Sequence, residues 1–180
     1  LGKLDPTWHE SKWIPVFAEK LFREVVQSRR GFAYGYPQAG SNIDTEVKFH
    51  SAADVVRYFP RAFQIGTFSP FPATWMAPGV SPGADRMRLL SGAETALAYL
   101  LLPGVVLLFV RCQDRRALCA VALMLTVITV IAVIIMALVV SNVGTLYRMR
   151  YGYWHVLLGL GVIGWGLWLQ RWRINHRRMR

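Results

Sequence analysis

The sequence has 180 residues, of which 54% are hydrophobic and 17% charged, yet Lys and Arg outnumber Asp and Glu by 21 to 10. A chain this apolar and this basic is unlike disordered, collagen-like or acidic-tail proteins. Two cysteines are too few for a disulfide-stapled scaffold. Two classes remain: a membrane protein with basic flanks, or a nucleic-acid-binding protein with an unusual core.

The charged residues divide the chain near residue 88. Residues 1–88 carry 11 Lys and Arg against 8 Asp and Glu, whereas the rest carries ten arginines, no lysine and two acidic residues. Those arginines bracket long apolar stretches instead of clustering on a soluble face, which argues against nucleic acid as the partner. We expect an external, membrane-associated segment over residues 1–88, a transmembrane region over 89–170 and a basic tail over 171–180.

Residues 13–27 have the apolar periodicity of an amphipathic helix, with Ser11 in the N-cap position and Pro15 in the first turn. The Arg-Arg-Gly sequence at residues 29–31 is expected to end this helix. Such a helix either lies in the lipid headgroup region or packs on its own small domain, and the sequence leaves both readings open.

A turn-rich stretch follows at residues 34–44, punctuated by glycine and proline. A short strand is expected at residues 46–49. The Ser-Ala-Ala-Asp sequence at residues 51–54 resembles a capping box. It predicts a helix through about residue 59, where Pro60 ends or kinks it.

Residues 63–82 are dense in aromatic residues and proline, which is typical of a segment at the membrane surface that leads to a first span.

Three apolar stretches make up most of the chain after this segment. Residues 117–140 are 24 residues without a charge, enough to cross a bilayer core about 30 Å thick. Further spans are expected at residues 89–110 and 153–169. The sequence therefore predicts a mainly α protein, with three transmembrane helices preceded by a small external α-rich segment with loops.

The orientation follows from the flanking charges. Eight arginines lie in the loop at residues 111–116 and in the tail, against two in the loop at residues 141–155. Because positive charge is retained in the cytoplasm, we expect an inner (plasma) membrane protein with a cytoplasmic C-terminus and with residues 1–88 in the periplasm or outside the cell. Cys112 and Cys119 would then be reduced and inert.

The chain begins with Leu and without a signal sequence. We therefore expect either the C-terminal piece of a longer multi-pass protein or a matured chain. The alternative is a cytoplasmic N-terminal half that needs no export.

Several polar side chains are candidates for a site. The four histidines have no metal-ligand spacing, so no metal and no cofactor are expected. Glu94 lies inside the first predicted span, where a buried carboxylate needs a partner such as Arg148 or Arg150; contact with headgroups is the alternative. Arg57 and Arg61 share one helix face, where they would bind one anion or form a solvated face.

Four short stretches carry a resemblance to a known family. The sequence Asn-Val-Gly-Thr-Leu-Tyr-Arg-Met-Arg at residues 142–150, before the last span, resembles the C-terminal part of bacterial multi-pass polysaccharide-biosynthesis membrane proteins. These include integral-membrane glycosyltransferases and O-antigen polymerase-like proteins. Residues 39–44, 54–61 and 70–72 are similar to external segments of such proteins.

The resemblance implies the C-terminal part of a membrane glycosyltransferase or polymerase that acts on polyprenyl-phosphate-linked sugars. Asp44 would be the external carboxylate that activates an acceptor hydroxyl, while Arg148 and Arg150 bind the lipid phosphate. The expected partners are membrane lipids, the lipid-linked sugar and other transmembrane helices of the same protein or complex. The alternative is a non-catalytic accessory transmembrane subunit of a large membrane protein complex.

Overall fold

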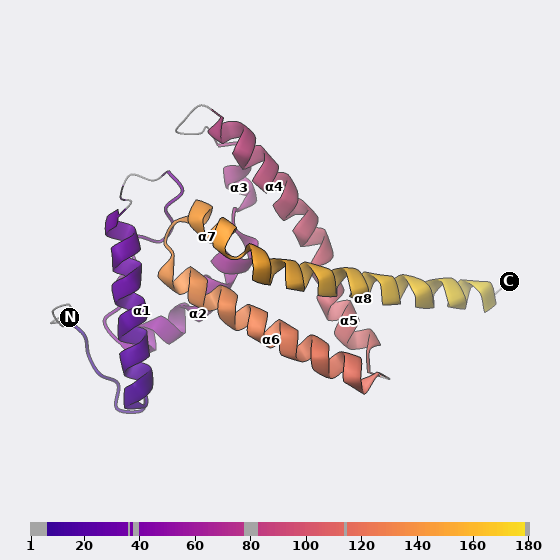
Figure 1. Ribbon diagram of the computed structural model, residues 1–180, viewed down its shortest axis with the longest axis horizontal. Coiled ribbons are helices and arrows are strands. Elements are labelled where there is room, and N and C mark those ends of the chain that lie inside the picture. The colour runs from indigo at the N-terminus through magenta and orange to yellow at the C-terminus, as the bar shows by residue number, and fades with distance from the viewer. Residues whose placement is uncertain (1–6, 36, 38–39, 78–82, 114, 179–180) are drawn as a thin grey trace. The chain divides into compact units, whose positions relative to one another are not determined.

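The computed structural model describes residues 7–35, 37, 40–77, 83–113 and 115–178 (Figure 1). These residues are mainly helical, and the only strand-like pairings among them are two isolated bridges. The helices, in chain order, are α1 (Val16–Gly35), α2 (Ala52–Phe68), α3 (Pro72–Trp75), α4 (Ala84–Leu101), α5 (Pro103–Arg111), α6 (Arg116–Val139), α7 (Val143–Met149) and α8 (Tyr151–Arg178).

The chain divides into two compact units. Unit 1 comprises Leu1–Ser69 and Val133–Met149, and therefore contains α1, α2, α7 and the last turns of α6. Unit 2 comprises Pro70–Ala132 and Arg150–Arg180, with α3, α4, α5, α8 and the rest of α6.

Three helical segments among the described residues are long and apolar enough to cross a membrane: Asp85–Arg111, Arg116–Val139 and Tyr151–Ile174. The predicted fold class, a mainly α protein with three transmembrane helices after an α-rich segment, is confirmed. Residues 78–82 and the last two residues of the expected tail lie outside the described residues.

Unit 2 is held together by the close approach of α5 and α8, which make the most extensive helix contact in the described part of the chain. A Cβ atom on Gly164 would collide with the carbonyl oxygen of Gly104, and one on Gly161 with that of Leu101. Glycine at these positions lets the two backbones meet, which is a common way for helices to pack in a membrane.

The junction of α4 and α5 lies at Pro103, which has no N–H to continue the helix ladder. Near this junction the carbonyl oxygen of Leu100 accepts a hydrogen bond from Nε1 of Trp165 at 3.0 Å. Lipid offers no water to carbonyl groups, so a partner from another helix of the protein stabilises the break.

Helix α2 begins where the sequence predicts and ends later. Ser51 is the N-cap, and its Oγ accepts a hydrogen bond from the Asp54 N–H at 3.2 Å. The expectation that the helix ends near residue 59 is wrong, since α2 continues through Pro60 to Phe68. Pro60 lies on the exposed side, while a continuous buried face keeps the helix in place. That face comprises Ala52, Val55, Tyr58, Ala62, Ile65 and Gly66.

Helix α1 also extends beyond its predicted end. It runs on to Gly35 through the Arg-Arg-Gly sequence, because Arg29 lies on the buried face and is held there. The strand expected at residues 46–49 is absent from the described chain. In its place the Val47 N–H donates to the Asp44 carbonyl oxygen at 3.2 Å, which forms a turn.

Two expectations about the ends of α6 are corrected. Part of the loop expected after α6 is the helix α7, which Asn142 caps by accepting the Thr145 N–H at 3.0 Å through its Oδ1. At the other end, Cys112 and Cys119 form a disulfide. The expectation of two separate thiols is therefore wrong: the turn between α5 and α6 brings the two sulfur atoms together.

Candidate functional site

Two of the stretches that carry the resemblance are paired in unit 1. The Ile43 N–H donates to the Ser141 carbonyl oxygen, and the Val143 N–H donates to the Ser41 carbonyl oxygen, each at 2.9 Å. These two backbone hydrogen bonds fix the position of the residues just before Asp44. Both stretches can be recognised in the sequence, but only their pairing in the fold shows that they belong to one local structure.

A third stretch supplies the partners of Asp44. The Tyr58 hydroxyl and Nε of Arg61 both donate to Oδ2 of Asp44 at 2.8 Å, and a second guanidinium nitrogen of Arg61 donates to Oδ1 at 3.1 Å. The Asp44 side chain is 17% exposed. Its backbone is left-handed, with φ of 51°, a conformation that aspartate tolerates better than most residues.

These contacts fix the charge states of the cluster. Hydrogen bonds from Arg61 lower the pKa of Asp44 below its ordinary value in spite of burial, and Tyr58 lowers it further. The hydrogen bond to Asp44 raises the pKa of Arg61, while burial chiefly raises the pKa of Tyr58 to about 12. A carboxylate stabilised in this way is a weak base. The geometry favours a role for Asp44 in positioning its neighbours over proton abstraction.

Arg29 connects this cluster to a membrane span. Its side chain is buried, and one guanidinium nitrogen donates to the carbonyl oxygens of Ala137 and Leu138 at 3.2 Å each, while the other donates to the Asp44 carbonyl oxygen at 2.9 Å. The last carbonyl groups of a helix have no partner within the helix and favour a cation. Arg29 therefore caps the end of α6 and ties unit 1 to that end of the span.

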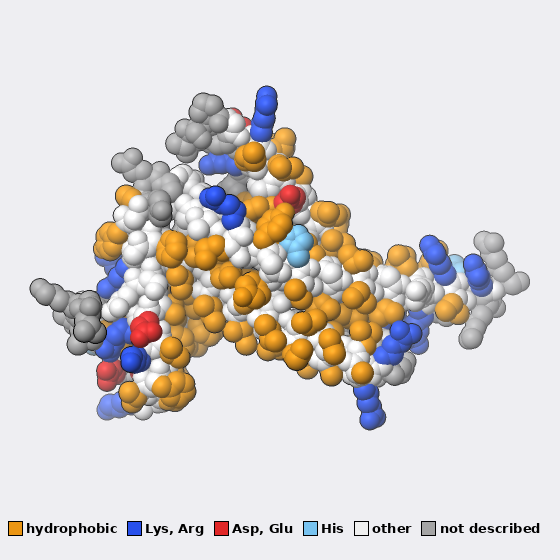
Figure 2. All heavy atoms as spheres, viewed as in Figure 1, with side chains coloured by type: hydrophobic (Ala, Val, Ile, Leu, Met, Phe, Trp, Pro, Cys, Tyr) orange, Lys and Arg blue, Asp and Glu red, His pale blue; other side chains and the backbone are white. Residues whose placement is uncertain are grey.

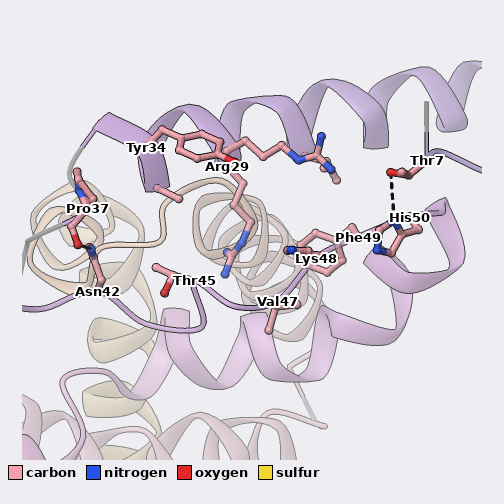
Figure 3. A pocket seen from close by; sticks show the side chains of 13 residues that line it. Thr7, Arg29, Tyr34, Pro37, Asn42, Thr45, Val47, Lys48, Phe49 and His50 are labelled. Carbon is pink, nitrogen blue, oxygen red and sulfur yellow. Dashed lines mark hydrogen bonds between the residues drawn. The ribbon is translucent and has the colours of Figure 1, made fainter. Parts of the chain in front are cut away.

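A cavity of about 550 Å³ opens between α1 and the segment of residues 42–50. Figure 3 shows the Arg29 side chain reaching from α1 toward that segment, and Nδ1 of His50 lies 3.2 Å from Oγ1 of Thr7. Basic side chains line the cavity from both walls: Arg29, Arg30, Lys48 and His50. The remaining lining residues are Thr7, Val26, Ala33, Tyr34, Pro37, Asn42, Thr45, Val47 and Phe49.

The lining favours an anionic ligand. Among the described residues that line the cavity, none carries a carboxylate. Arginine and lysine bind phosphate oxygens through charge-assisted hydrogen bonds, and hydroxyl and amide groups nearby suit the oxygens of a sugar. No group of three or more His, Cys, Asp or Glu suited to a metal ion occurs within the described chain.

Arg57 and Arg61, predicted either to bind one anion or to form a solvated face, have different neighbours. The Arg57 side chain is 82% exposed and lies 3.9 Å from Asp54. Arg61 binds Asp44 and also donates to Oε1 of Gln64 at 2.8 Å. Each arginine thus faces its own carboxylate.

Arg148 and Arg150 fall into different units. Arg148 belongs to unit 1, is exposed, and donates from Nε to the Gly144 carbonyl oxygen of its own helix at 3.2 Å. Arg150 belongs to unit 2 and is fully buried, with its guanidinium carbon 4.6 Å from the ring centroid of Trp154. Burial of this kind suits packing of the cation on the aromatic ring.

Glu94 is half-buried on α4 in unit 2. Its Oε2 accepts a hydrogen bond from the Tyr151 hydroxyl at 3.3 Å, and the Tyr151 ring lies 4.3 Å from the ring of His155. The structure thus gives Glu94 a tyrosine hydroxyl as one neighbour.

Sequence reasoning missed the residues that form the cavity and the cap. For Arg29 a signal was present: it follows Val26 by three residues and so falls on the apolar face of α1. For Lys48 and His50 the signal was weaker, since they only flank the buried Phe49. Their convergence with α1 depends on the tertiary fold.

No protein-family model, no curated protein and no solved structure matches this chain. The site is therefore assigned from its own contacts, burial and charge.

Proposed function

We propose that this chain is the C-terminal part of a membrane glycosyltransferase or polymerase acting on polyprenyl-phosphate-linked sugars, and that the cavity of unit 1 holds the substrate phosphate. One observation carries the proposal: a cavity with basic walls lies in the unit that caps the end of a spanning helix. A lipid-linked phosphate is confined to the membrane surface, so its binding site belongs at the end of a span.

The residues of the cavity have separate roles. Arg30 and Lys48 come from opposite walls and bind the phosphate oxygens. Arg29 contributes positive charge while its hydrogen bonds hold α6 and the Asp44 loop. Asp44 orients Arg61 and Tyr58 through hydrogen bonds, and so keeps in place the cavity wall that residues 42–50 form. The phosphate is assigned to this cavity in preference to Arg148 and Arg150, because Arg150 is buried against Trp154.

Binding of an undecaprenyl-phosphate analogue to the detergent-solubilised chain tests this role. We expect Arg30→Gln and Lys48→Gln each to weaken binding about ten-fold, the loss of one hydrogen bond to a charged group. Arg148→Gln is the matched control and should retain the wild-type affinity. Equal affinity in all four proteins would contradict the proposal.

One observation favours the alternative, a non-catalytic accessory subunit. Among the described lining residues no carboxylate is available as a base, and the carboxylate of Asp44 already accepts three hydrogen bonds. Sugar transfer from a labelled lipid carrier separates the two functions. Turnover that Asp44→Asn abolishes, with binding intact, would support an enzyme in which Asp44 reacts. Binding without turnover in the wild type would support the accessory subunit.

We propose that residues 1–88 face the periplasm or the outside of the cell and that the C-terminus is cytoplasmic, on the basis of the arginine distribution. The disulfide between Cys112 and Cys119 favours the opposite orientation, since such bonds are rare in the cytoplasm. Single cysteines at the exposed positions 149 and 177, labelled with an impermeant reagent in intact cells, decide the matter. Labelling at position 149 alone supports the proposal, and labelling at position 177 alone reverses it.

A further inference from the structure

The first two turns of α1, together with Trp13 just before the helix, expose a cluster of apolar side chains that no other part of the described chain covers. Trp13 is 75% exposed, Val16 86%, Phe17 71% and Leu21 56%. We name these four residues the α1 apolar end. In Figure 2 hydrophobic side chains gather at the end of α1 where the helix begins, with Lys and Arg beside them.

The opposite side of α1 already contacts the chain that precedes the helix, so the α1 apolar end cannot be buried by rotation of the helix. Glu19 is buried, and its two oxygens accept hydrogen bonds from Trp8 Nε1 at 3.0 Å and from the Ser11 N–H at 2.8 Å. Arg23 pairs with Glu10 at 3.1 Å. These contacts hold the chain before α1 against one side of the helix and leave the other side facing out.

We propose that the α1 apolar end docks into the headgroup region of an anionic bilayer. Unit 1 includes the last turns of α6, a predicted span, and Arg29 of α1 binds the carbonyl groups of those turns. A bilayer is therefore close to α1. Lys12 and Lys20 are exposed beside the apolar side chains, and lysine next to Trp and Phe is the pattern of a helix held by anionic lipids. Tryptophan also favours this depth.

The surface of α1 that can dock is limited to the beginning of the helix. Along its exposed face, Lys20 is followed one turn later by Glu24 and two turns later by Ser28. The carboxylate of Glu24 is repelled by anionic lipid. Only the beginning of the helix therefore enters the headgroup region, and this docking restrains the α1 wall of the cavity. Docking of the α1 apolar end is independent of the ligand that the cavity holds.

A lipid-quenching experiment on the full chain tests the docking. A fluorescent probe is attached at Phe17→Cys or at Ser28→Cys, with Cys112 and Cys119 replaced by serine, and the protein is reconstituted in phosphatidylglycerol-containing vesicles with brominated acyl chains. Ser28 is the matched control, since it is exposed and lies on the same face three turns later. We expect brominated lipid to quench the probe at position 17 and not the probe at position 28, and aqueous iodide to do the reverse.

Charge removal provides the second measurement. The ratio of docked to undocked helix ends should fall about five-fold for each lysine replaced in Lys12→Gln and Lys20→Gln. Equal quenching by iodide at both positions, without quenching by lipid at position 17, would overturn the proposal. Protection of position 17 from both quenchers would also overturn it, because a protein surface would then cover the α1 apolar end.

Discussion

The two units of the molecule are stabilised by different physics. In unit 1 polar side chains from segments far apart in sequence converge: Arg29 caps α6, and the Asp44 carboxylate accepts hydrogen bonds from Tyr58 and Arg61. In unit 2 the α5 and α8 backbones meet at glycines with few charged groups nearby. The difference matches their surroundings, since an aqueous interface tolerates a charged network, whereas the hydrocarbon core favours close packing. It also indicates where a soluble or anionic ligand can bind.

The largest expected effect is at the glycine contact of unit 2. Gly164→Val places a side chain against the backbone of Gly104, and we expect a loss of about 3 kcal/mol or more in the free energy of unfolding. Hydrogen exchange should increase in α5 and α8 and stay unchanged in α1 and α2. Gly159→Val is the control, since a Cβ there meets no atom within 4 Å. Equal destabilisation by both variants would contradict the close contact.

Arg29→Met is the corresponding test of unit 1. It leaves the carbonyl groups of Ala137, Leu138 and Asp44 without their buried donor. We expect a loss of about 3 kcal/mol, read as faster hydrogen exchange at the end of α6 and in α2. Arg57→Met, which alters a side chain that is 82% exposed, should change exchange little. An Arg29→Met protein as stable as Arg57→Met would show that the cap contributes nothing.

The contrast between the polar network of unit 1 and the apolar packing of unit 2 explains how much of each could be predicted from the sequence. The spans of unit 2 were predictable because hydrophobicity and length act locally, and only details such as the break at Pro103 needed the fold. In unit 1 the N-cap Ser51 was predictable from four residues. The end of α2 was not, because burial of Val55 and Ile65 outweighs the lost N–H of Pro60. The partners of Asp44 depend on contacts between distant segments, which no local pattern contains.

Asp44→Asn removes the charge from the pair with Arg61 and should cost about 1–2 kcal/mol, since the pair is only partly exposed. The pH dependence is more specific. The pKa of Asp44 is lowered in the folded state, so its stabilisation is complete above the ordinary aspartate pKa of about 3.9 and is lost as the pH falls through the lowered value. The protection factors in unit 1, which correct for the slower intrinsic exchange at low pH, should thus fall at low pH in the wild type, and less steeply in Asp44→Asn. Identical pH profiles would count against this contribution.

Tyr58→Phe should have the smallest effect, about 1 kcal/mol, because it removes one hydrogen bond to Asp44 and keeps the ring beneath Arg29. Urea titration of the reconstituted chain, followed by exchange in α2, measures it. Tyr58→Leu is the companion variant: a larger loss than in Tyr58→Phe shows that the ring also contributes, and no loss in either would remove Tyr58 from the network.

We propose that the basic cavity of unit 1, and not the arginines at residues 148–150, receives the phosphate of a lipid-linked substrate. The most direct measurement is photo-cross-linking with a polyprenyl phosphate that carries a photoreactive group next to the phosphate, followed by mapping of the labelled peptides. We expect label within residues 26–50, reduced in Lys48→Gln and competed by unlabelled polyprenyl phosphate. Competed label confined to residues 142–150, with residues 26–50 unmodified, would contradict it.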